Sequence, residues 1–286
     1  MTKPIVVGVD GSVASLRAAA WGGQEAALRD APLRVVHAAL RWDYDVPLVP
    51  QPLGWGAGSE AAAREMLHRA TLHARAGRPH LKVTAEILDG RAQEALVTAA
   101  AEAQLVVVGD RGRSGLPGLL LGSVSQHVAT HAPCSVAVVR QPQAGRHGVI
   151  VVGVTGQPDQ EPVLDFAFRE ASLRHAVLRA VHAWRHPARR APGDIQPLVY
   201  DVQGIADEEA RLLAEAIAGW RERFPDVTLA EQVIHAHPAK ALNEASAEAD
   251  LVVIGARSGT RALFGLGGTA HAVLHHSHAP VVVARS

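Results

Sequence analysis

The stretch Ile5–Ser12 reads IVVGVDGS, and it recurs as IVVGVTGQ at Ile150–Gln157. Each copy opens with apolar residues at consecutive positions, which predicts a strand buried on both faces, as in a parallel sheet. A helix-like segment follows each strand, and strands and helices then alternate through the rest of each half. This alternation predicts right-handed crossovers and an open, doubly wound α/β sheet.

Other segments recur at nearly the same spacing, which indicates a tandem duplication. LRVVHA at Leu33–Ala38 returns as LRAVHA at Leu178–Ala183, and AEAQLVVVG at Ala101–Gly109 returns as AEADLVVIG at Ala247–Gly255. We therefore expect two domains, residues 1–141 and 148–286, joined by a polar, glycine-containing linker. Each domain is predicted to hold an open five-stranded parallel sheet with helices on both faces.

The composition excludes several classes of protein. Among 286 residues, 28 Lys and Arg balance 28 Asp and Glu, so no basic field points to nucleic acid or to a membrane surface. The single cysteine excludes an intrachain disulfide. Neither a signal-peptide pattern nor a run of about 18 apolar residues occurs, so we expect a cytoplasmic protein without membrane contact.

The glycine-rich stretch VVVGDRGRSGLPGLLLGSVSQHV at Val106–Val128 follows a predicted strand and precedes a predicted helix. One interpretation is a surface loop without a ligand. The other is a phosphate site, because the free amides and positive dipole end of a helix N-terminus attract anions. In that interpretation Gly122 lets a phosphate approach the backbone, and Arg111 and Arg113 supply further donors.

The motif Gly109-x2-Gly112-x9-Gly122-Ser123, with VVGVDGS and VVHA, resembles the ATP-binding signature of the universal stress protein family, and the chain resembles that family's tandem members from end to end. The resemblance implies a Rossmann-like fold related to the adenine nucleotide alpha hydrolases, bound ATP or another adenine nucleotide, and a role in stress survival. It implies that Asp10 lies on the nucleoside side, where a carboxylate can accept hydrogen bonds from ribose hydroxyls. Beside phosphates a carboxylate would need a cation between them, so bound Mg²⁺ is compatible with the site. The other residues that the resemblance places around the nucleotide are Ala38 and Leu88 beside the adenine, and Gly109, Gly112, Gly122, Ser123, Val124 and Ser125 beside the phosphates.

Asp10 has two interpretations from the residues alone, since an Asp at a strand-to-helix turn can also cap the helix. The resemblance favours ligand contact. In the second half Thr155 stands in place of Asp10 and Ser258 in place of Gly112, while Gly255, Gly268 and Thr269 are retained. We expect a weaker nucleotide site there, partly because position 112 is expected to need a left-handed backbone that glycine adopts easily.

Three function classes stay open. The first is a nucleotide-binding regulatory module, the second a slow ATPase or adenylyl-transfer enzyme, and the third an interaction protein without a ligand. No nucleophile with a matching base is recognisable, and Asp110 is the only acid in the glycine-rich stretch. The histidine pair His271 and His275 has a spacing that could chelate zinc, but no further ligand completes a site, so no metal site is predicted.

The partners expected besides the nucleotide are proteins. The last strand of each half (Val136–Val139 and Val281–Val283) is short and apolar, and pairing the two would cover both edges. We therefore expect an intrachain pseudo-dimer of the two domains, compatible with a further homodimer and with an unidentified regulatory partner.

Overall fold

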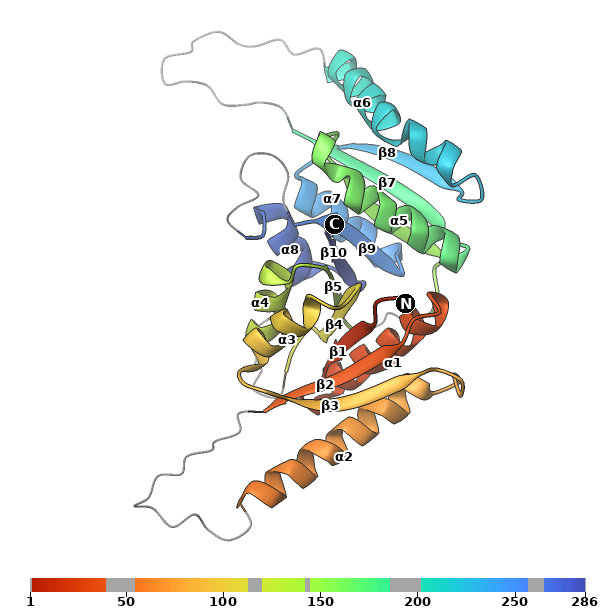
Figure 1. The fold of residues 1–286 in the computed structure, drawn as a ribbon. Coiled ribbons are helices and arrows are strands. Elements are labelled where there is room, and N and C mark those ends of the chain that lie inside the picture. The colour runs from red at the N-terminus through yellow and green to blue at the C-terminus, as the bar shows by residue number, and fades with distance from the viewer. Residues whose placement is uncertain are drawn as a thin grey trace, which may run out of the picture. The chain divides into compact units, whose positions relative to one another are not determined.

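The computed structural model describes residues 2–39, 55–112, 120–141, 145–185, 202–256 and 265–285. The chain divides into two compact units, Met1–Pro142 with Arg285–Ser286 and Gln143–Ala284. Each unit is a layered α/β structure, with helices on both faces of its strands (Figure 1). The same succession of strands and helices is built twice.

The first unit has all its neighbouring strands parallel, in the order β3-β2-β1-β4-β5. The direction of winding changes between β1 and β4, and the carboxyl ends of two such strands flank a crevice. Its elements are β1 (Ile5–Gly8), α1 (Val13–Leu28), β2 (Leu33–Ala39), α2 (Trp55–Arg75), β3 (Val83–Asp89), α3 (Ala92–Ala100), β4 (Leu105–Gly109), α4 (Ser123–His131) and β5 (Ser135–Val139).

The second unit repeats this topology in the order β10-β9-β6-β7-β8, again with parallel neighbours. Its elements are β6 (Val149–Val154), η1 (Pro158–Gln160), α5 (Glu161–Arg174), β7 (Val177–Trp184), α6 (Val202–Arg223), β8 (Leu229–His235), α7 (Pro238–Ala245), η2 (Ser246–Glu248), β9 (Leu251–Gly255), α8 (Gly268–His276) and β10 (Val281–Ala284). The predicted fold class, two tandem Rossmann-like α/β domains, is confirmed.

The core lies along the central strands, as their continuous apolar sequence requires. Every residue of β4 is buried, and Ile5, Val6 and Val7 of β1 have no exposed surface. Helix α1 packs on β1 and β4 and against α2, while α3 packs against α4. The two helix pairs lie on opposite faces of the sheet (Figure 1). The crevice at the carboxyl ends of β1 and β4 therefore lies between the two helix layers.

The equivalent helix–helix contact is formed by side chains of very different size in the two units. In the first unit Gly23 of α1 lies against α2, and a Cβ atom on it would stand 2.2 Å from the carbonyl oxygen of Ala74. In the second unit Phe168 of α5 stacks on Trp220 of α6 with ring centroids 5.7 Å apart. Small residues bring one helix pair close, whereas aromatic rings fill the space between the other.

Replacing Gly23 by alanine is expected to destabilise the first unit. The added methyl group would meet the backbone of α2, which cannot rotate away as a side chain can, so we expect a loss of about 1–3 kcal/mol in the free energy of unfolding. Thermal and urea unfolding measure the loss. Gly219→Ala in α6 is the control: beyond its own helix backbone, no atom of the described residues lies within 4 Å of its added Cβ, and it should stabilise its helix by up to about 1 kcal/mol. A Gly23→Ala protein as stable as the wild type would contradict the close contact.

In the part of the chain that the structure describes, no helix has the length and apolar character that crossing a bilayer requires.

Candidate functional site

A cavity of about 210 Å³ lies at the carboxyl ends of β1 and β4, where the strand order changes direction. The predicted site residues that line it are Asp10, Ala38, Gly109, Gly112, Gly122, Ser123, Val124 and Ser125. Leu88 lies on β3, where it pairs with Ala38 of the neighbouring strand β2, and it is not among the lining residues. Arg113 lies outside the described residues. Residues that the sequence did not assign to the site also line the cavity, including His37, Ser15 and Leu96.

Asp10 shapes the turn between β1 and α1 but does not cap the helix. Its Oδ1 accepts a hydrogen bond from the backbone N–H of Ser12 at 3.0 Å. Ser12 is the N-cap residue, and its Oγ accepts from the N–H of Ser15 at 3.1 Å. The capping role considered for Asp10 therefore belongs to Ser12, and Asp10 lines the cavity with its carboxylate held by the turn.

Gly112 is packed directly against this carboxylate. A Cβ atom on Gly112 would stand 2.6 Å from Oδ2 of Asp10, so any larger residue forces the carboxylate or the loop to move. The backbone at Gly112 does not have a positive φ angle. The expectation of a left-handed backbone here was wrong: glycine at this position instead leaves space for the carboxylate of Asp10.

Two further glycines of the motif have different roles. A Cβ on Gly109 would stand 2.8 Å from the carbonyl carbon of Ala14, so this glycine lets the end of β4 approach α1. Gly122 is the N-cap of α4 with φ −76° and ψ 149°, a conformation open to any residue. A Cβ there would have its nearest neighbours at 3.5 Å. The fold thus requires glycine at position 109 but not at position 122.

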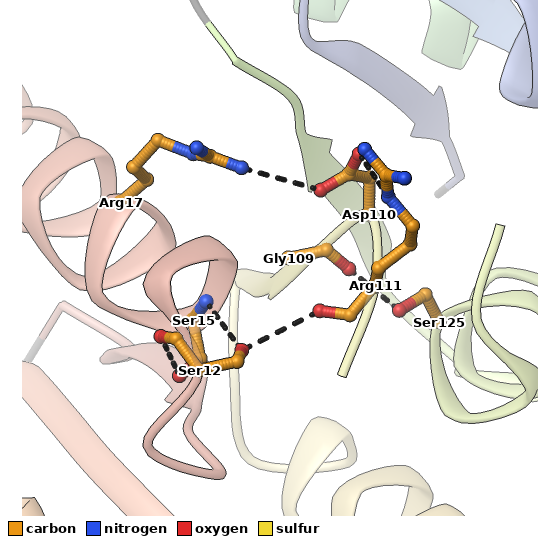
Figure 2. Close-up of polar contacts among 7 residues, drawn as sticks. All are labelled: Ser12, Ser15, Arg17, Gly109, Asp110, Arg111 and Ser125. Atoms are coloured by element: carbon orange, nitrogen blue, oxygen red, sulfur yellow. Dashed lines mark hydrogen bonds and ion pairs between the residues drawn. The ribbon is translucent and has the colours of Figure 1, made fainter. Parts of the chain in front are cut away.

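The first turn of α4 is anchored but not capped. Ser125 Oγ donates a hydrogen bond to the carbonyl oxygen of Gly109 at 2.6 Å, which ties the helix to the end of β4 (Figure 2). Gly122 has no side chain to bond the amides of the first turn. Ser12 Oγ also donates to the carbonyl oxygen of Arg111 at 3.5 Å, so the loops after β1 and β4 are joined.

Arginines surround the one buried carboxylate of the β4 loop. Asp110 is 4% exposed, and its oxygens lie 3.7 Å from Arg17 Nη2 and 3.5 Å from Arg111 Nε (Figure 2). Burial lowers the pKa of Arg140, and the charge of Asp110 opposes that decrease. Three cations around one anion leave an excess of positive charge beside the loop. Asp110 does not line the cavity, so it is poorly placed to act as a base there.

His37 lines the cavity, although it is not among the site residues predicted from the sequence. Its Nδ1 lies 2.8 Å from the carbonyl oxygen of Val9, which can only accept, so Nδ1 carries a proton. Within the described residues no protein group bonds its Nε2. The signal that could have identified it is its position at the carboxyl end of β2, beside the predicted Ala38.

The second unit has a cavity at the equivalent strand ends, with a volume of about 500 Å³. The predicted residues Gly255, Gly268 and Thr269 all line it. The N-cap of α8 is Gly267, whose N–H bonds the carbonyl oxygen of Ala256 at 2.9 Å, as Gly122 bonds Asp110. The loop before α8 is one residue shorter, so Gly267, not Gly268, takes the place of Gly122.

In the second cavity, backbone groups at the end of β6 and the ring of His182 are bonded to side chains of the same unit. Gln160 Oε1 accepts from the N–H groups of Thr155 at 2.6 Å and Gly156 at 3.0 Å, and its Nε2 donates to the carbonyl oxygen of Gly153 at 3.2 Å. The ring of His182 lies 2.8 Å from the carbonyl oxygen of Val154 through Nδ1 and 2.7 Å from the carboxylate of Glu209 through Nε2.

The repeated parallel sheet, with a cavity at each change of winding direction, defines a tandem protein with a Rossmann-like fold. The model of the universal stress protein family matches residues 1–140 and 147–285. The chain therefore belongs to the universal stress protein family.

The chain is similar to several proteins of known name or structure. Universal stress protein Rv2005c of Mycobacterium tuberculosis is 38% identical over 300 residues, which cover 100% of this chain and 99% of the relative. The crystal structure of a universal stress protein from Archaeoglobus fulgidus has a TM-score of 0.72 at 17% identity and covers 99% of this chain and 98% of its own. A universal stress protein solved in complex with cAMP is 32% identical over 48% of this chain and 96% of its own, with a TM-score of 0.40.

Proposed function

We propose that the first unit binds ATP or a related adenine nucleotide, and that the protein is a nucleotide-dependent regulatory module in stress survival. The observation that carries the proposal is Gly122. Glycine begins α4 although neither its backbone angles nor its neighbours among the described residues require one. A glycine there leaves the first-turn amides of the helix open, which suits a phosphate group.

The other residues of the cavity have matching proposed roles. Asp10 would accept hydrogen bonds from ribose hydroxyls or hold a Mg²⁺ ion that also contacts the phosphates. Arg111 and the surrounding positive charge would favour the phosphates. Ala38 and the Nε2 atom of His37, at the end of β2, would border the base. The roles predicted for Leu88 and Arg113 remain predictions.

A direct experiment tests the ligand. Mass spectrometry of the supernatant from denatured, purified protein identifies any nucleotide that co-purifies, and calorimetry with ATP, ADP and cAMP gives affinity and stoichiometry. We expect one tight site for an adenine nucleotide. A protein that neither carries nor binds any of these nucleotides would instead fit the alternative of an interaction module without a ligand.

We expect the bound nucleotide to act as a switch, with turnover at or below about one per minute, far under ordinary enzyme rates. The acid of the β4 loop, Asp110, is buried beside arginines and does not line the cavity of the first unit. A phosphate-release assay measures the rate. Turnover of about one per second or faster, lost in Asp10→Ala, would favour the alternative of an ATPase or adenylyl-transfer enzyme.

The second unit is proposed to bind nucleotide more weakly, through Gly255 and the α8 N-terminus at Gly268 and Thr269. Thr155 keeps the turn of Asp10, since its Oγ1 accepts from the N–H of Gln157 at 3.3 Å. It does not carry the negative charge, so the nucleoside side of this cavity lacks a carboxylate at that position.

We also propose that β5 and β10 pair, joining the two domains as a pseudo-dimer. Each is the last strand of its own unit, and both are apolar. Hydrogen exchange on the full-length protein tests this proposal. Pairing requires protection of those β5 amides that do not bond to β4, and rapid exchange of the same amides would contradict it.

A further inference from the structure

In the second cavity Gln160 occupies the hydrogen-bonding groups at the end of β6. Its side-chain amide bonds two N–H groups and one carbonyl oxygen of residues 153–156. The residue is only 7% exposed and lines the cavity wall. A ligand that needs these backbone groups must first displace a buried side chain from three hydrogen bonds.

The first unit has Ser15 at the equivalent position, which does not reach the strand end. Ser12 and Gln157 are the residues that precede the first helical turns of the two units, and three positions later stand Ser15 and Gln160. The hydroxyl of Ser15 donates to the carbonyl oxygen of Ser12 at 2.9 Å, within its own helix. Within the described residues, the N–H of Gly11, equivalent to Gly156, bonds no protein group.

The histidines of the two cavities also differ in whether a side chain of the same unit bonds their Nε2 atom. Gly11 lies against Met66 of α2, and the equivalent Gly156 lies against Leu212 of α6. Three residues before these contacts stand Ala63 in the first unit and Glu209 in the second. Glu209 bonds Nε2 of His182, whereas the methyl group of Ala63 offers His37 no partner.

Space does not explain a weaker second site. The second cavity has about 500 Å³ against about 210 Å³ in the first, and small-molecule sites commonly enclose about 300–1,000 Å³. On volume alone the second unit would be the better receptor. The backbone groups at the end of β6 and the ring of His182, however, are already bonded to side chains of the same unit.

We infer that Gln160 is a built-in occupant of the second cavity, assisted by Glu209 on His182, and that it keeps this unit free of nucleotide at concentrations that fill the first. The inference rests on the proposed nucleotide site of the first unit. It attributes the difference in nucleotide affinity between the two units to side chains that compete with the ligand, in addition to the absence of a carboxylate at Thr155.

The test is Gln160→Ser, which installs the first unit's residue in the full-length protein. Calorimetric titration with ATP should give one site in the wild type and a second site in the variant, with affinity at that site raised about 10- to 100-fold. Each displaced neutral hydrogen bond is expected to change an equilibrium about 2- to 10-fold. Glu161→Gln, at an exposed neighbouring position, is the matched control and should keep one site. The reciprocal Ser15→Gln should weaken binding to the first unit.

Amide exchange followed by NMR gives a second readout that needs no ligand. The N–H groups of Thr155 and Gly156 should exchange slowly in the wild type and at least about tenfold faster in Gln160→Ser, while Gly11 exchanges rapidly in both. Rapid exchange of Thr155 and Gly156 in the wild type would overturn the inference even if the variant failed to fold.

The titration separates the two levels of proposal. A wild type with one site and a Gln160→Ser variant with one site, its amides released, would overturn the inference and leave the proposed function intact. Two equal sites in the wild type would also overturn it. A wild type without any nucleotide binding would remove the proposed function and this inference together.

Discussion

Replacing Gly122 by valine is expected to abolish ATP binding to the first unit and to leave the unit folded. The valine side chain would stand at the N-cap of α4, over the amides proposed to hold phosphate. A phosphate kept from these amides loses at least two charge-assisted hydrogen bonds of about 1.5–3 kcal/mol each, so affinity should fall more than about 100-fold. Calorimetry measures the affinity, and circular dichroism with thermal melting measures the fold.

A second glycine of the same loop provides the contrast. Gly109→Val should destabilise the unit strongly, because its Cβ would stand 2.8 Å from the backbone of Ala14. Gly122→Val has no such contact, since the nearest atoms to its Cβ are 3.5 Å away. Unchanged ATP affinity in Gly122→Val would show that α4 does not hold the phosphates. A large loss of stability in that variant would show that Gly122 is needed by the fold.

Replacing Asp10 by alanine is expected to weaken ATP binding about 10- to 150-fold. The estimate follows from the loss of one charged hydrogen bond, about 1.5–3 kcal/mol. Alanine also removes the bond to the N–H of Ser12, so Asp10→Asn is the matched variant, because its amide oxygen can keep that bond while the charge is lost. We expect Asp10→Asn to lose most of the affinity with little change in stability.

The reciprocal change tests the same carboxylate in the other unit. Thr155→Asp should strengthen nucleotide binding to the second cavity, and more so in combination with Gln160→Ser. A wild-type affinity retained in full by both Asp10→Ala and Asp10→Asn would remove Asp10 from the site and reduce its role to the turn between β1 and α1.

The fold could be predicted from the sequence because its signals are local and repeated. Consecutive apolar residues such as Ile5, Val6 and Val7 predicted buried parallel strands, and the structure places them there without exposed surface. The repeat then predicted the second sheet from the first. The glycine-rich loop lies beside the turn after β1 because β1 and β4 are neighbouring strands, which the structure shows.

The site was predicted less completely, because its details depend on tertiary neighbours. The motif contains glycine at both position 109 and position 122. Only the packing of α1 against the end of β4 shows that position 109 has no space for a larger residue. Gly112 lies against the carboxylate of Asp10, and no local sequence pattern shows this contact. The shift to Gly267 reflects a one-residue difference in loop length, which the letters GG cannot reveal. Gln160 belongs to the second cavity through three hydrogen bonds to residues 153–156, which its sequence position does not predict.

The unequal helix contacts of the two units have an evolutionary consequence. Gly23 faces Ala74 in one repeat, and Phe168 faces Trp220 in the other. Recombination that joined α1 of the first repeat to α6 of the second would leave a gap beside Trp220, and the opposite exchange would force Phe168 into the backbone of Ala74. Each hybrid would carry a packing defect, so we expect selection against gene conversion between the repeats. Under such selection the two halves would diverge independently, each keeping its own helix packing.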